Sequence, residues 1–426
     1  MHLTDEEKRM RDGVEGDAVA VAMDLLIRYG DALQAERLVA TRNVAGTMTQ
    51  PSPAKAKLVA EGGWAKAFAV MNLDSDRELD IPSMRVPTCQ LQHGFGADAE
   101  GLTRYPADSI RLQEDAESYF TERGVRVLGT CTPYQVGNLP VLGEHCAWME
   151  SSAVVYANSV LGARTNCEGA ASTGAASLTG RIPYWGNHLP ANRLATHLVR
   201  AETPVEGFRE WGLLGYFVGE LVQEARPAVV GSLAPASDAD LKHFGAATAT
   251  SGGVELYHLP GVTPEAPTLD AAFGSARIPE AVTYGRRERR ATYETLNAQG
   301  ESTEVDFVLL GCPHASLAQV QEIAGLLEGR RLADGVQLWI MLPRALAADA
   351  LRQGWTRTIT RAGGRVLTES CPAMSRAAPP GTRVMATDSA KQAHYLPAIL
   401  GIEAWFGTTR ECVDAAVTGR WRGELT

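Results

Sequence analysis

The chain has 426 residues, of which 45% are hydrophobic and 21% are charged, a composition that is ordinary for a globular protein. This length exceeds what one hydrophobic core usually supports, so we expect two or three domains. Acidic residues outnumber basic ones by 50 to 40, and the net charge of -10 argues against a nucleic acid or an anionic membrane as the main partner.

The amino terminus resembles neither a secretion signal nor a transit peptide, and no apolar run reaches the length of a membrane span. The cytoplasm is therefore the expected location. The sequence contains seven cysteines without regular spacing, which indicates reduced thiols rather than a disulfide framework.

The first part of the chain begins with Thr4 and Glu7, which have the spacing of a capping box at the start of a helix. Apolar periodicity then predicts, in chain order, a helix over 18–29 closed by Gly30, a strand over 37–40, a helix over 53–61 and a strand over 67–71. Between residues 72 and 105 the periodicity fades, and we expect irregular structure there.

The middle of the chain resumes with a predicted helix that begins at Asp108 and stops at Gly124. The elements expected after it are a strand over 125–128, a Gly/Ala/Ser segment over 169–180, a helix over 204–225 and a strand over 228–230. A stretch over 233–279 is rich in Pro, Gly, Ala and Ser, so it is expected to contain the boundary between an amino-terminal region (1–235) and a carboxyl-terminal region (236–426).

The last part of the chain opens with a charge block over 286–290, which we interpret as a solvated helix face. Strands then alternate with helices; strands are predicted over 305–310, 336–342, 365–367, 384–386 and 402–406, and one of the helices over 316–327. This alternation predicts an α/β fold with mostly parallel sheets between layers of helices.

The stretch from Gly143 to Asn166 holds two carboxylates, a histidine, several hydroxyls, two amides and one arginine in a run that is otherwise small and apolar. A buried polar group without a partner costs about 1 to 3 kcal/mol, so these groups must satisfy one another or face a ligand. We interpret the stretch as the lining of a site.

Three cysteines share one local pattern. Cys131, Cys312 and Cys371 each follow an apolar strand and are followed by proline within two residues. Ligands collect at the carboxyl ends of strands in α/β proteins, and proline ends the strand there. Cys312 also precedes a predicted helix with Ser316 as its cap, and helix amino ends stabilise thiolates.

The repeated pattern favours a metal centre over three unrelated buried thiols. Three thiolates on a four-iron cluster would leave one iron open as a Lewis acid for a substrate hydroxyl. A cation would be needed for a substrate carboxylate, and the first candidate is Lys391, which opens a helix after a strand; Arg164 is the second. The remaining cysteines are assigned to the core: Cys89, Cys146, Cys167 and Cys412.

Taken together, these motifs resemble the large, catalytic subunit of aconitase X, a branch of the aconitase superfamily. The resemblance covers nearly the whole chain and is carried by Thr130–Tyr134, Gly143-Glu144, Glu150–Asn166, Gly311–His314, Cys371-Pro372 and Asp388–Tyr395. It implies α/β/α layers of the aconitase large-subunit type around an iron-sulfur cluster held by the three cysteines.

The resemblance also implies which side chains contact the substrate. They are Ser151, Ser152, Asn158 and Lys391, and the segment ending at Thr47 looks like the early loop of the family that faces the site. Cys167 stands where a basic residue is expected after Arg-Thr-Asn. The chain reaches Thr426 without the small swivelling domain that carries a serine base in this superfamily, so a separate small subunit is the expected partner.

The resulting hypothesis is a hydro-lyase that removes water from a small hydroxy acid. Candidate acids or hydrogen-bond donors are His314, Glu150 and Glu144, and His314 can equally be a structural histidine. Family members act on cis-3-hydroxy-L-proline or on mevalonate 5-phosphate. The first is preferred because the sequence shows no glycine-rich phosphate loop with a lysine.

Alternatives remain open at this stage. The cluster is expected to contain four irons, although two or three irons fit the same ligands. A non-catalytic assembly subunit is disfavoured because the three cysteines are intact. A zinc enzyme that uses two or three of these thiolates with His314 is a further possibility.

Overall fold

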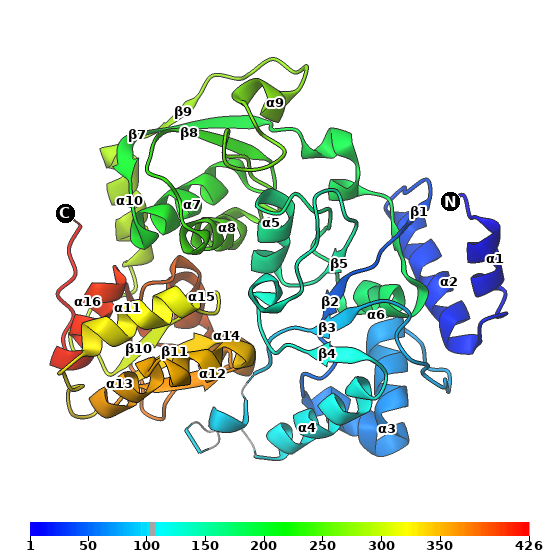
Figure 1. Cartoon of the computed structure of the whole chain (residues 1–426), viewed down its shortest axis with the longest axis horizontal. Coiled ribbons are helices and arrows are strands. Elements are labelled where there is room, and N and C mark those ends of the chain that lie inside the picture. Colours follow the sequence, from blue (N-terminus) through cyan, green and yellow to red (C-terminus); the bar gives the residue numbers. More distant parts are fainter. Residues whose placement is uncertain (95, 100, 103–106, 426) are drawn as a thin grey trace.

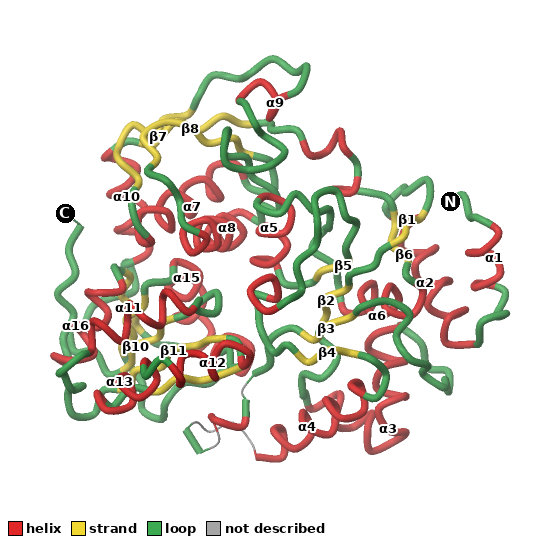
Figure 2. The backbone as a smooth tube through the Cα atoms, viewed as in Figure 1, coloured by secondary structure: helices red, strands yellow, loops and turns green. Residues whose placement is uncertain are grey.

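The computed structural model describes residues 1–94, 96–99, 101–102 and 107–425. Its described residues form helices and four mostly parallel sheets (Figures 1 and 2). Every strand pairing is parallel except that of β1 with β6. The α/β fold predicted from the alternation of elements is therefore confirmed.

The first region contains a four-stranded parallel sheet with the order β4-β3-β2-β5. Its strands are β2 (Val44–Gly46), β3 (Thr88–Gln90), β4 (Val125–Val127) and β5 (Ala147–Trp148). The helices of this region are α1 (Asp5–Arg11), α2 (Asp17–Ala32), α3 (Pro53–Leu73), α4 (Ala107–Thr121), α5 (Ser151–Ser159) and α6 (Ala170–Thr179). Because the four strands are parallel, the loops that follow them leave from one edge of the sheet.

Shorter elements complete the first region. The capping box of Thr4 and Glu7 forms as expected. The antiparallel pair consists of β1 (Leu38–Ala40) and β6 (Arg181–Pro183). The 3-10 turns are η1 (Ala97–Ala99), η2 (Pro133–Val136), η3 (Gly186–His188) and η4 (Pro190–Arg193).

The second region is a three-stranded sheet packed on a pair of helices, at the upper left of Figure 1. The strands are β7 (His197–Val205), β8 (Pro227–Leu233) and β9 (Val282–Tyr284), in the order β8-β7-β9. The helices are α7 (Phe208–Val222), α8 (Asp238–Gly252), α9 (Leu269–Phe273) and α10 (Arg286–Leu296).

The third region is a five-stranded parallel sheet with the order β12-β11-β10-β13-β14. The strands are β10 (Phe307–Leu310), β11 (Gln337–Leu342), β12 (Arg365–Thr368), β13 (Val384–Thr387) and β14 (Glu403–Phe406). The helices are α11 (Leu317–Leu327), α12 (Arg344–Arg352), α13 (Trp355–Ala362), α14 (Pro372–Ser375), α15 (Ala390–Leu400) and α16 (Thr409–Thr418). All five strands predicted here are present.

Two sequence-based predictions in the first two regions were wrong. Residues 67–71 belong to helix α3, which continues beyond a kink at Gly62 and Gly63, where both residues leave the helical conformation. The start of the predicted helix 204–225 is strand β7, and the helix begins at Phe208. The segments 169–180 and 233–279, for which no helix or strand was predicted, hold helices α6, α8 and α9.

Two further expectations concern charge and irregular structure. The charge block 286–290 is not wholly solvated, because Arg289 donates to Glu210 at 2.6 and 2.8 Å. The irregular stretch 72–105 contains β3 and η1 among its described residues, and its positions 95, 100 and 103–105 lie outside the described part of the chain.

Helices α7 and α8 pack closely through glycines. A Cβ atom on Gly215 would lie 2.6 Å from the carbonyl oxygen of Phe244, and one on Gly219 would lie 2.5 Å from that of Thr248. The neighbouring atoms are helix backbone, which cannot move without separating the two helices. Glycine at these positions thus sets the distance between α7 and α8.

We predict that Gly215→Ala lowers the free energy of unfolding by about 1 to 3 kcal/mol through overpacking. Gly325→Ala is the matched control, because a Cβ atom there meets no atom within 4 Å on helix α11. That control should stabilise the protein by up to about 1 kcal/mol through helix propensity. Chemical denaturation measures both variants, and equal effects of the two substitutions would contradict this account of the α7–α8 contact.

Candidate functional site

The three cysteines follow strands of two different sheets. Cys131 follows β4 in the first region, and Cys312 and Cys371 follow β10 and β12 in the third. Cys131 is buried and the other two are partly exposed. The thiolates of Cys131 and Cys371 would each repel that of Cys312, so the three side chains share one neighbourhood. Among the described residues, no three or more His, Cys, Asp or Glu side chains lie close enough together to hold a single metal ion.

The surroundings of the three thiols oppose ionisation unless a cation is supplied. Burial raises the pKa of Cys131 and Cys312, and it raises the pKa of Cys371 to about 12. For Cys312, the positive charge of Lys391 and a hydrogen bond from Ser389 act against burial. These residues fit a metal centre by their chemistry, because thiolates need a positive partner in such surroundings.

A buried ion pair lies beside the thiols. The Lys391 ammonium donates to Glu150 Oε1 at 2.7 Å, and the side chains are only 19% and 14% exposed. Gln92 and Ser152 donate to the same carboxylate at 2.7 and 2.9 Å. The pair therefore joins the end of β5 in the first region to the start of α15 in the third.

The partners of Glu150 determine its charge. Burial alone would raise the pKa of Glu150, but attraction to Lys391 and hydrogen bonds from Lys391, Gln92 and Ser152 lower this pKa to about 2. In turn, burial would lower the pKa of Lys391, and the nearby Glu150 and Cys312 raise it instead. Both side chains are thus ionised at neutral pH.

Of three more predicted residues, one contacts this ion pair and two are close to Glu150 through the chain. Ser152 reaches Glu150 directly, and Ser151 is the first residue of α5, next to Glu150 in the chain. Thr47 follows β2 and its hydroxyl contacts the Met149 sulfur at 3.1 Å. The loops after β2, β3, β4 and β5 therefore bring Thr47, Gln92, Cys131 and Glu150 to the same edge of the first sheet.

His314 connects two cysteine loops. Its Nδ1 lies 2.9 Å from the Thr130 hydroxyl, and its Nε2 lies 3.0 Å from the Ser370 carbonyl oxygen. Since a carbonyl oxygen only accepts, Nε2 carries the proton and Nδ1 accepts from Thr130 in the neutral ring. The backbone N–H of His314 also donates to Cys131 Sγ at 3.3 Å. Burial lowers the pKa of His314 to about 4, so the ring is neutral at pH 7.

Three predicted residues have their polar groups directed elsewhere. Asn158 donates to the carbonyl oxygens of Thr165 and Glu255, and its own oxygen accepts from the Thr165 N–H. Glu144 accepts from the Val141 N–H in an exposed loop. The Arg164 guanidinium lies beside the carbonyl oxygen of His188 at 3.5 Å.

One cysteine assignment was wrong, and the others were right. Cys89, Cys146 and Cys412 are buried as predicted, whereas Cys167 is exposed. Its thiol donates to the Met149 carbonyl oxygen at 3.2 Å, and its N–H donates to Glu255. Cys167 forms an isolated backbone bridge with Trp148 of β5, outside the named strands.

Sequence reasoning missed two neighbours of the site. Gln92 lies two residues after the end of β3. Residues at the carboxyl ends of parallel strands are frequent ligand contacts, so this position was a signal for the site. Lys242 is 2% exposed within α8, and it donates to the His314 carbonyl oxygen at 2.7 Å and to Gln319 at 2.9 Å. No helix was predicted around Lys242, and its burial depends on the third region packing against α8.

Comparison with known proteins connects this geometry to a family. The chain matches the aconitase X first domain over residues 1–191, the aconitase X second domain over residues 195–294 and the aconitase X third domain over residues 305–418. This chain belongs to the aconitase X family. The predicted division at residue 235 stays a prediction, and it falls within the second matched segment.

Relatives within the aconitase X family carry two activities in their names. The phosphomevalonate dehydratase large subunit of Methanocaldococcus jannaschii is 34% identical over 96% of this chain and 99% of its own length. The cis-3-hydroxy-L-proline dehydratase of Pseudomonas aeruginosa is 39% identical over 71% of this chain and 52% of its own length. The crystal structure of Thermococcus kodakaraensis aconitase X in its holo-form matches with a TM-score of 0.82 and 32% identity, covering 98% of this chain and 100% of that one.

The Glu150–Lys391 pair predicts a specific pH dependence of stability. The folded-state pKa of Glu150 is about 2, below its ordinary 4.5, so its stabilising effect is complete above pH 4.5 and is lost as the pH falls toward 2. The difference in unfolding free energy between wild type and Glu150→Gln should therefore shrink over this interval. Urea denaturation at a series of pH values measures it, and a difference that stays constant would contradict the pairing.

A second variant tests the same pair at neutral pH. Lys391→Met leaves a buried carboxylate without its cation and should cost roughly 3 kcal/mol of stability. Adding Glu150→Gln to that variant removes the unpaired charge and should recover part of the loss. Losses that simply add in the double variant would show that the two side chains are not coupled.

Proposed function

We propose that the chain is the large subunit of an iron-sulfur-dependent hydro-lyase that dehydrates a small hydroxy acid, with cis-3-hydroxy-L-proline as the first candidate. The observation that carries the proposal is the shared neighbourhood of Cys131, Cys312 and Cys371 with the Lys391–Glu150 pair. The dehydratase names of the relatives support the same reaction class.

The three cysteines would hold the cluster, for which four irons are preferred and two or three remain possible. Thiols that are neighbours without surrounding a single ion suit a cluster, in which each thiolate binds a different iron. When bound, such a cluster supplies a Lewis acid that favours departure of the substrate hydroxyl. The three cysteines follow the ends of β4, β10 and β12, which supports this assignment because ligands collect at the carboxyl ends of strands.

The ion pair and its neighbours bind and orient the substrate in this proposal. Lys391 contacts the substrate carboxylate, while Ser151, Ser152 and Thr47 offer hydroxyl hydrogen bonds beside it. Glu150 has a pKa of about 2, so it is a poor proton donor at neutral pH and holds the Lys391 ammonium in place instead. Asn158 and Arg164 contribute by shaping the loop around residue 165 rather than by direct contact.

His314 acts as a positioning residue. Its ring links the Thr130 hydroxyl to the Ser370 carbonyl oxygen, and so it ties the loop of Cys131 to that of Cys371. The base that removes the substrate proton is expected on a separate small subunit, because relatives of nearly equal length are named large subunits. Glu144 lies outside this arrangement.

A second substrate has a specific observation in its favour. The phosphomevalonate dehydratase large subunits match over almost their full lengths, whereas the cis-3-hydroxy-L-proline dehydratase of Hypocrea jecorina is covered over 69% of its length. Mevalonate 5-phosphate is therefore the alternative. Against it, Lys391 is already paired with Glu150, and Lys242, a second lysine near the thiols, already donates to the His314 carbonyl oxygen and to Gln319.

We predict that the anaerobically purified protein binds iron and acid-labile sulfide in similar amounts and absorbs visible light. Cys131→Ser, Cys312→Ser and Cys371→Ser should each lose most of the iron and sulfide, because each removes one of three thiolates. Cys412→Ser, a buried thiol elsewhere in the third region, is the control and should retain them. Zinc at one atom per chain without sulfide would instead support the zinc enzyme.

The substrate is tested by direct assay of both candidates with the small subunit present. Dehydration of cis-3-hydroxy-L-proline is the expected activity, and Lys391→Met should lower kcat/KM by 100-fold or more because a charged contact is lost. Turnover of mevalonate 5-phosphate alone would replace the first candidate with the second. Activity of the large subunit without its partner would contradict the assignment of the base.

A further inference from the structure

One surface loop carries the most exposed large apolar side chains of the described residues. Leu139, Val141 and Leu142 are 61%, 68% and 63% exposed. A single exposed hydrophobic residue is ordinary on a protein surface, but three of them within four consecutive positions form an apolar patch, which is typical of a contact with another protein. We call residues 139–142 the apolar loop.

The apolar loop has a defined backbone conformation. The Val141 N–H donates to Glu144 Oε2, and the Glu144 N–H donates to the Val141 carbonyl oxygen, both at 3.0 Å. The Gly143 N–H then donates to the Gly162 carbonyl oxygen at 2.8 Å. Because these bonds hold the backbone, the apolar side chains stay at the surface, and little ordering is needed when a partner binds them.

The apolar loop begins beside the candidate site. It follows η2, in which the Gln135 side chain donates to the His314 carbonyl oxygen at 3.1 Å. Leu139 lines one cavity together with Gln135 and Lys242, and Lys242 donates to the same carbonyl oxygen. The start of the loop is therefore close to the segment that follows Cys312.

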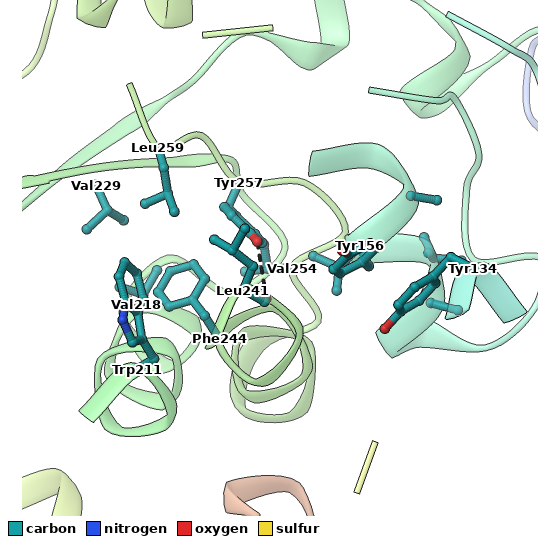
Figure 3. Close-up of a cluster of buried hydrophobic side chains, with 14 of the residues drawn as sticks. Tyr134, Tyr156, Trp211, Val218, Val229, Leu241, Phe244, Val254, Tyr257 and Leu259 are labelled. Atoms are coloured by element: carbon teal, nitrogen blue, oxygen red, sulfur yellow. Dashed lines mark hydrogen bonds between the residues drawn. The ribbon is translucent and has the colours of Figure 1, made fainter. Parts of the chain in front are cut away.

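An aromatic contact connects this end of the loop to helix α5. The rings of Tyr134 in η2 and Tyr156 in α5 stack with their centroids 3.9 Å apart (Figure 3). Helix α5 begins directly after Glu150. The apolar loop is thus held between the elements that carry Cys131 and Glu150, and a protein that docks on it is placed next to the site.

The apolar surface continues onto the second region of the chain. A Cβ atom on Gly162 would collide with the Leu142 side chain and would lie 3.0 Å from Pro264 Cγ, so Leu142 and Pro264 are neighbours. Val262, two residues before Pro264, is 57% exposed. Apolar contacts offered by two separate segments suit a protein surface better than a small ligand.

Chain length indicates which partner covers the apolar loop. The phosphomevalonate dehydratase large subunit of Methanocaldococcus jannaschii is matched over 99% of its length. The cis-3-hydroxy-L-proline dehydratase of Hypocrea jecorina, whose name mentions no subunit, is matched over 69% of its length. A hydro-lyase built on this chain therefore needs a second polypeptide, and the base on that polypeptide has to reach a substrate beside Cys131 and Glu150.

We propose that the apolar loop is the docking surface for the small subunit, which covers Leu139, Val141 and Leu142 with apolar side chains of its own. This inference rests on the proposed two-subunit hydro-lyase. The contact holds the small subunit beside the site without using the residues that bind the substrate. Glu144, which lies outside the site, fixes the loop in the conformation that the small subunit contacts.

Sedimentation velocity with the full-length chain and the purified small subunit of the same organism tests this contact. Wild type should form a complex, and Val141→Asp should raise its Kd by roughly tenfold or more, because a carboxylate is then buried in an apolar contact. Val14→Asp is the matched control, since Val14 is 60% exposed in the connection from α1 to α2 at the right edge of Figure 1. The control should bind the small subunit like wild type.

A second variant separates docking from folding. Leu139→Asp should weaken binding of the small subunit to a similar extent as Val141→Asp. Both variants should keep the wild-type Tm in the absence of the small subunit, because the replaced side chains are exposed there.

Three results would each overturn the proposal. They are a wild-type chain that does not bind the small subunit, variants that bind it as tightly as wild type, and self-association of the wild-type chain that Val141→Asp abolishes. In the last case a second copy of the chain would occupy the loop. Binding is measured without substrate, so the expected affinities without any dehydration would contradict the proposed function and leave this contact standing.

Discussion

The contact between Lys391 and Glu150 fixes how the first and third regions of the chain meet. The two residues are 241 positions apart, yet their charged groups lie 2.7 Å from each other with little exposure to water. Separating them without solvating both would leave an isolated buried charge, which is far more costly than keeping the pair. The ion pair therefore determines the register in which one sheet edge faces the other.

The same constraint assembles the thiols. Cys131 leaves the edge of the first sheet that carries Glu150, and Cys312 and Cys371 leave the edge of the third sheet next to Lys391. His314 strengthens this arrangement because its ring and backbone contact the loops of Cys131 and Cys371 together. Burial raises the pKa of each thiol and so disfavours the thiolates. A cation placed among the three sulfurs would offset this effect by stabilising the thiolates.

Local sequence patterns are sufficient to select the candidate site residues that follow strands or begin helices. A strand followed by cysteine and proline is visible within ten residues, and so Cys131, Cys312 and Cys371 could be chosen as candidates, as could Lys391 at a helix start. The role of Gln92 and the burial of Lys242 could not be predicted, because they depend on contacts between regions. Asn158 looked like a substrate ligand in the sequence, yet its side chain is hydrogen-bonded to Thr165 and to the Glu255 carbonyl oxygen. Helix α6 was missed because Gly, Ala and Ser fit tight helix packing and turns equally well.

An anomalous difference map at the iron absorption edge, from crystals grown without oxygen, tests the central claim most directly. The account predicts one strong peak enclosed by the sulfur atoms of Cys131, Cys312 and Cys371, on the side where Lys391 meets Glu150. Iron density elsewhere in the molecule, or none among these three sulfurs in protein shown to contain iron, would contradict it.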